Sequence, residues 1–119
     1  MSKNDDIIHF DFEKVKSYLD SDKVVINSFL LLIKVELQKS LHDIEAQYQA
    51  GNLVLLKEAG HKLKGTGLSA ALPQLTAIAI QINKLTEFND AHVAGLLKEL
   101  KEEIAAVLIL VDAHTVNYK

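Results

Sequence analysis

Apolar residues recur at three- and four-residue spacings along most of this 119-residue chain, which is the pattern of amphipathic helices. The spacing predicts five helices, over residues 11–20, 23–48, 53–70, 73–86 and 91–113. The longest apolar stripe lies on the second of these helices and comprises Ile26, Phe29, Leu30, Ile33, Leu37, Leu41, Ile44 and Tyr48. No segment sustains the strict alternation of a half-buried strand, so we expect no sheet.

The predicted helix starts carry residues whose short polar side chains favour a helix N-terminus. These residues are Asp11, Ser21 or Asp22, Asn52, and Asn89 or Asp90. Pro73 suits the first turn of the fourth helix, where a backbone N–H is not needed. Because the links between the four long helices are short, we expect an all-α fold: an antiparallel up-down four-helix bundle with an additional short N-terminal helix.

The second predicted helix carries more apolar positions than one face of a bundle requires. Leu31, Leu32 and Val35 lie outside its main stripe. Two interpretations are open, because these residues either pack under the short first helix or form a dimer contact. We favour packing and expect a monomer.

The composition fits one domain over residues 1–119, with an ordered core of about residues 10–113. Thirteen lysines, no arginine and a net charge of −3 leave no basic patch for nucleic acid and no bidentate clamp for a nucleotide. The N-terminus does not resemble a signal peptide, and charged residues interrupt the most apolar stretch, Val24–Leu37. We therefore expect a soluble, cytoplasmic protein that binds neither nucleic acid nor membranes.

The candidate chemistry lies in the third predicted helix, in the run Gly60-His61-Lys62-Leu63-Lys64-Gly65-Thr66-Gly67. His61 is one position off the apolar seam of this helix, so its imidazole should face solvent as a nucleophile. Lys64 follows one turn later, where its ammonium would offset the charge of a phosphoryl group. Gly65 would leave room for a partner beside the imidazole.

Glycine destabilises a helix interior by roughly 1 kcal/mol relative to alanine, so three glycines in one helix need an explanation. Close packing against a neighbouring helix suits Gly60 and Gly67, which face inward. Gly65 faces outward with His61, and there access to the imidazole is the better explanation.

The run from His61 to Gly65 resembles the His-x-Leu-Lys-Gly signature of histidine-containing phosphotransfer (HPt) domains. The resemblance extends over residues 10–112 and includes apolar residues on the next helix, Leu75, Ile78 and Ile82. It implies that His61 accepts a phosphoryl group from the aspartyl phosphate of a receiver domain and passes it to another receiver. It also implies that Nε2 is the acceptor atom, that Lys64 stabilises the phosphate charge, and that Gly65 gives steric access.

The resemblance further implies which molecules take part in the relay. The partners would be response regulator receiver domains and a hybrid sensor histidine kinase. The receiver would bring Mg²⁺, so we expect no cofactor or metal belonging to this chain. The protein would be a phosphoryl carrier rather than an enzyme with kinase or phosphatase activity of its own.

Four residues are candidates for contact with a partner: Lys57, Leu68, Phe12 and Asn83. Lys57 would add positive potential or simply be a solvated lysine, and Leu68 would add an apolar contact one turn beyond Lys64. Phe12, with Phe10, would either close over the region of His61 or cap the bundle core. Asn83 would orient the imidazole or the phosphate.

The sequence departs from the family at two positions that bear on these predictions. Asn83 stands where a glutamine or glutamate is common, and its shorter side chain puts that orienting role in question. Ala71 stands where glycine is usual, so we expect a slightly different helix end.

Other functions have less support from the sequence. His9, His42, His92 and His114 form no pair at the spacing of a helical metal site. The main alternative is an HPt-like docking module that binds a receiver or sensor kinase without carrying phosphate. A structural bundle that dimerises through its second helix is a further possibility.

Overall fold

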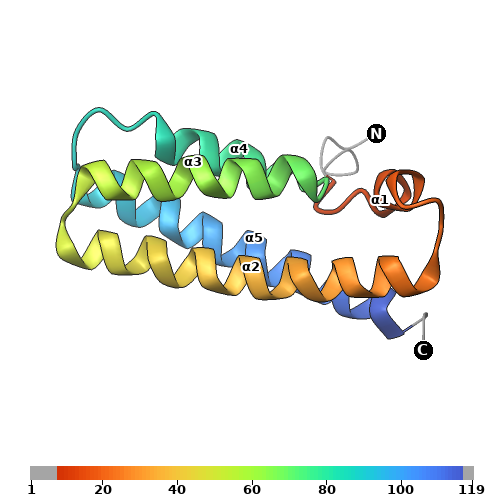
Figure 1. Ribbon diagram of the computed structural model, residues 1–119. Coiled ribbons are helices and arrows are strands. Elements are labelled where there is room, and N and C mark those ends of the chain that lie inside the picture. Colours follow the sequence, from red (N-terminus) through yellow and green to blue (C-terminus); the bar gives the residue numbers. More distant parts are fainter. Residues whose placement is uncertain (1–7, 117–119) are drawn as a thin grey trace, which may run out of the picture.

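The computed structural model describes residues 8–116, and Figure 1 shows that this part of the chain consists of helices joined by loops. Its helices are α1 (Phe12–Tyr18), α2 (Lys23–Ala50), α3 (Leu53–Ser69), α4 (Pro73–Asn83) and α5 (Asp90–Val116). No strand occurs within the described residues, so the expected all-α fold is confirmed. None of these helices has an apolar stretch of the length and purity needed to cross a lipid bilayer.

The four long helices pack as a ring in which each contacts two others. Helix α2 packs on α3 and α5, and α4 packs on the same two helices from the opposite side. Consecutive helices run in opposite directions, as Figure 1 shows, so the bundle is antiparallel. The short helix α1 lies at the end of the bundle where α2 begins and α3 and α5 end. The predicted architecture is therefore correct.

The core is built from the apolar stripes that periodicity predicts. Side chains with no exposed surface come from each of the long helices; they include Leu30, Leu37, Ile44, Leu56, Leu63, Leu75, Ile82 and Leu100. Three residues of the predicted α2 stripe, Phe29, Leu41 and Tyr48, are only partly buried and pack at its edge. Burial of these faces against one another is the main force that holds the helices in place.

Polar side chains begin the helices as expected. At α2 the cap is Asp22 rather than Ser21, because the Asp22 carboxylate accepts the backbone N–H groups of Val24 and Val25 at 3.0 and 3.1 Å. The Asn52 side chain accepts the Leu55 N–H at 3.0 Å at the start of α3, and Asn89 does the same for His92 before α5. Each cap satisfies a donor that the helix itself leaves unpaired.

Two features of the predicted helices are wrong. Helix α4 ends at Asn83 and does not reach residue 86, because the Leu85 N–H turns back onto the Ile82 carbonyl and Leu85 folds into the core. The second error concerns α2. Leu31, Leu32 and Val35 do not pack under α1; each is at least half exposed, because α1 covers the end of the bundle rather than its side.

Candidate functional site

The outward face of α3 carries His61. The imidazole is exposed, whereas Gly60 and Leu63 beside it are buried against the bundle. Lys57 lies four residues before His61, and Lys64 and Leu68 lie three and seven residues after it; residues at these spacings share one side of a helix. The structure therefore places His61 and Lys64 together on an accessible face, as the sequence predicts.

The two polar groups at the centre of this face are not engaged by neighbouring side chains. Within residues 8–116, no hydrogen bond or ion pair joins the imidazole of His61 or the ammonium of Lys64 to another residue. The nearby Thr66 hydroxyl donates back to the Lys62 carbonyl at 3.4 Å. The imidazole and the ammonium are thus both available to an incoming anion.

The three glycines of α3 separate into the two groups that the sequence predicts. A Cβ on Gly60 would lie 2.8 Å from Cγ2 of Ile82, and a Cβ on Gly67 would collide with the Thr76 hydroxyl. These two glycines let α4 pack directly on the α3 backbone. A Cβ on Gly65 would meet nothing within 4 Å, so packing inside the protein does not require glycine there.

A shallow hollow of about 390 Å³ opens beside His61. It is lined by Val54, Lys57, Glu58, His61, Lys62 and Asn83. The Asn83 side chain comes from the last residue of α4, and its Nδ2 donates to the backbone carbonyl of Lys57 at 3.1 Å. Lys57 and Asn83 are therefore brought together with His61, as expected.

Leu68 is exposed to solvent, whereas Phe12 is buried. Leu68 is 61% exposed, two turns beyond His61 on the same face, which agrees with a contact role. Phe12 is only 8% exposed, and its ring stacks on His114 with the centroids 3.7 Å apart. The expectation that Phe12 contacts a partner is therefore wrong. The alternative interpretation, that it caps the bundle core, is correct.

A second hollow, of about 320 Å³, lies between α2 and α3. Its lining residues are Phe29, Leu32, Ile33, Glu36, Gly65, Thr66, Ser69 and Ala70. The open position at Gly65 thus contributes to this hollow as well as to the surroundings of His61. No pattern within one helix reports the space between two helices, so the sequence alone does not predict this hollow.

The α2 side of that hollow continues into an exposed apolar surface. We call it the α2 apolar face, and it consists of Val24, Val25, Leu31, Leu32 and Val35. These residues are each between 45% and 77% exposed. Contiguous exposed apolar residues of this kind mark interaction sites in many soluble proteins. The extra apolar positions on this helix were the sequence signal for it.

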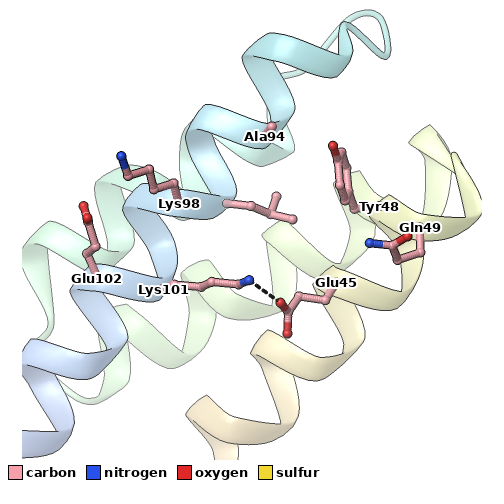
Figure 2. Close-up of a pocket in the computed structure, with 8 residues that line it drawn as sticks. Glu45, Tyr48, Gln49, Ala94, Lys98, Lys101 and Glu102 are labelled. Carbon is pink, nitrogen blue, oxygen red and sulfur yellow. Dashed lines mark ion pairs between the residues drawn. The ribbon is translucent and has the colours of Figure 1, made fainter.

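A third hollow, of about 440 Å³, lies between α2 and α5, where Figure 2 shows Lys101 pointing toward Glu45. Their charged atoms are 2.7 Å apart. None of the lining residues comes from α3, so this hollow is separate from the site of His61. In the described part of the chain, no group of three or more histidine, aspartate or glutamate side chains is placed to hold a metal ion.

The family model for the Hpt domain matches residues 28–109, which is more than half of the chain. The chain belongs to the Hpt domain family. Members of this family are phosphocarrier modules of phosphorelays, so the resemblance of the His61 motif is confirmed at the level of the family. Comparison with curated proteins gives no significant match.

The fold of this Hpt domain is also similar to that of a solved structure. The crystal structure of histidine-containing phosphotransfer protein B (HptB) from Pseudomonas aeruginosa PAO1 superposes on it with a TM-score of 0.82. The similarity covers 93% of this chain and 97% of HptB, at 19% sequence identity. At this identity, the match supports the bundle with its extra N-terminal helix as a shared fold.

Proposed function

We propose that this Hpt domain carries a phosphoryl group on His61 between receiver domains of a multistep phosphorelay. The observation that carries the proposal is the α3 face itself. It presents an exposed imidazole one turn from an uncommitted ammonium, beside a glycine that internal packing does not require. This arrangement suits a nucleophile that must meet a large partner and an anionic group at once.

The transfer step needs only groups that are present on this face or on a receiver. The lone pair of Nε2 attacks phosphorus as the bond to the aspartyl oxygen breaks, and the receiver recovers its carboxylate. The imidazole keeps its proton on Nδ1, so no general base is required. Lys64 offsets the charge of the phosphoryl oxygens, and the receiver supplies Mg²⁺. Passage to a second receiver is the reverse reaction.

The chain is a carrier in this proposal and has no kinase or phosphatase activity of its own. Its donors and acceptors are response regulator receivers, one of them attached to a hybrid sensor kinase, in the cytoplasm. Leu32 of the α2 apolar face lines the hollow over Gly65, and this region would bury apolar surface of a docked receiver. A small, partly apolar contact suits a partner that must leave after each transfer.

The proposal is tested by incubating the protein with phosphorylated receiver domains and Mg²⁺. We expect acid-labile, alkali-stable label on the wild type and no label on His61→Gln. The matched control is His92→Gln, which removes another exposed histidine, on α5, and should be labelled normally.

Two results would contradict the proposal. Label on His61→Gln would mean that another residue is the acceptor. Binding without transfer, across a broad panel of receivers and with folding verified, would favour the second candidate, a docking module. The α2 apolar face would serve such a module equally well.

A further inference from the structure

The Asn83 side chain bonds to the backbone of the turn that carries His61. Nδ2 of Asn83 donates to the carbonyl oxygen of Lys57, 3.1 Å away, across the contact between α4 and α3. Lys57 is four residues before His61, so in the α-helical pattern the same oxygen accepts the His61 N–H. A carbonyl oxygen has two lone pairs and can accept both donors.

The packing beside this bond leaves little freedom for the two helices to shift. Gly60 immediately precedes His61, and its missing side chain lets the last turn of α4 approach the α3 backbone. A Cβ there would lie 3.0 Å from the backbone nitrogen of Asn83. The bond and the close approach therefore fix the same turn of α3 from one side.

One N–H of this amide is already donated to the backbone, so the side chain is held toward Lys57 rather than toward an incoming phosphate. The side chain is half-buried, it is short, and it already donates to the backbone. It nevertheless lines the same hollow as His61. We propose that Asn83 is a positioning residue: it holds the Lys57–His61 turn so that the imidazole is presented in line with the phosphoryl group of a docked receiver.

This inference rests on the proposed function, and it predicts a specific division of effects. A receiver and the imidazole must be aligned for transfer, and misplacement of a reacting group slows such reactions strongly. A small phosphodonor such as phosphoramidate approaches an exposed imidazole from many directions. Loss of positioning should therefore slow transfer from a receiver and leave labelling by phosphoramidate unchanged.

The test compares Asn83→Ala and Asn83→Gln with the wild type and with Ile78→Val. The control variant removes one buried methylene from α4 and destabilises the bundle without touching the site. We expect both Asn83 variants to accept phosphate from a receiver about tenfold more slowly, at saturating receiver, with normal labelling by phosphoramidate. Ile78→Val should match the wild type in both assays.

The glutamine variant separates positioning from contact with phosphate. The longer side chain of glutamine carries the amide past the Lys57 carbonyl, so Asn83→Gln should still transfer slowly if Asn83 positions His61. If the amide bound phosphate directly, the longer side chain would still reach the phosphate and transfer would stay fast. Full activity of Asn83→Gln would overturn the proposal. Slower labelling of either variant by phosphoramidate would also overturn it, and so would Asn83→Ala transferring as fast as Ile78→Val.

A measurement that needs no phosphate keeps this inference distinct from the proposed function. In NMR spectra, the backbone amide and ring signals of His61 should move in both Asn83 variants and stay in place in Ile78→Val. Unchanged His61 signals in the Asn83 variants would contradict the positioning role. If the signals move but the wild type accepts phosphate from no receiver, the failure belongs to the proposed function.

Discussion

Gly65 and Gly60 are five residues apart on α3, yet a methyl group would have opposite effects at the two positions. The space around Gly65 is open, whereas Gly60 touches Ile82 and the end of α4. Of these two positions, packing offsets the cost of glycine in a helix interior only at Gly60. At Gly65 that cost remains, and in the proposed function it is the consequence of leaving room for a receiver.

We expect Gly65→Ala to stabilise the protein by up to about 1 kcal/mol and to slow phosphotransfer from receivers. The stability gain follows from helix propensity, since the new methyl meets no other atom within 4 Å. Gly60→Ala is the matched control and should destabilise by about 1–3 kcal/mol through overpacking against Ile82. Chemical denaturation and single-turnover transfer measure the two effects. Unchanged transfer by Gly65→Ala would contradict the access role.

At the scale of the element, the end of α3 explains why the family favours glycine ten residues after the histidine. Ala71 is in the left-handed region at φ 59°. The Leu72 N–H bonds to the Gly67 carbonyl at 2.8 Å and the Ala71 N–H to the Leu68 carbonyl at 3.4 Å, which is the Schellman pattern of helix termination. This chain ends the helix in the same way, although alanine is strained in the left-handed conformation.

Replacement of Ala71 by glycine should therefore raise stability. The relief of left-handed strain, roughly 1–2 kcal/mol, exceeds the roughly 0.8 kcal/mol lost with one buried methyl group. We expect a net gain of up to about 1 kcal/mol in the free energy of unfolding, with unchanged phosphotransfer. Ala70→Gly, at the neighbouring buried position, should destabilise instead. A less stable Ala71→Gly variant would contradict this account.

The segment around α1 is held to the bundle by two histidines. The Nδ1 atom of His9 lies 2.7 Å from Oε2 of Glu103, a carboxylate that is almost completely buried. His114, near the end of α5, stacks on Phe12. Burial, and secondarily the charge of Lys16, lowers the pKa of His114 below its ordinary value. The neutral imidazole is therefore the form that the fold favours.

The sign of the pH effect follows from that lowered pKa. Because the pKa of His114 is lower in the folded state, its contribution to stability is present at neutral pH and is lost as the pH falls through and below about 6.5. We expect the wild type to lose more stability than His114→Phe between about pH 7.5 and 5.5. Urea denaturation at the two pH values measures this difference. An equal or larger loss in His114→Phe would contradict it.

At the scale of the whole molecule, we propose that the α2 apolar face is too small to hold two copies together. It runs from Val24 to Val35, roughly 18 Å of helix, and a helix is about 10 Å wide. Stable interfaces use roughly 20–30 residues on each partner, whereas this face has five. The surface fits a transient contact with a receiver, and we propose that the protein is a monomer.

We therefore expect Leu32→Ser to weaken receiver binding about tenfold or more while the protein stays monomeric and as stable as the wild type. Leu32 is half exposed, so its loss leaves no cavity, and it lines the hollow over Gly65. Ile109→Ser is the matched control, since Ile109 is an exposed apolar residue on α5. Titration calorimetry and sedimentation report binding and mass. A wild-type dimer that Leu32→Ser dissociates would refute the monomer.

The features that the sequence predicted correctly are those that depend on neighbours along one helix. Helical periodicity reports which side of a helix is buried, so the core residues Leu37 and Ile44 could be assigned, and so could the exposure of His61. The position of α1 depends on the contact of Phe12 with His114, two residues far apart in the chain. The bond from Asn83 to Lys57 also joins two helices. No local pattern contains this information.

The division of the site between two helices has a consequence for how such a relay can diversify. In the proposed function, the reacting groups lie on α3, whereas the α2 apolar face adds a recognition surface on a different helix. The residues of the α2 apolar face are exposed, so replacing them should change the free energy of unfolding little and should not move His61. After a gene duplication, substitutions on α2 would thus be enough to give the two copies different partners, while both copies keep the same reaction at His61.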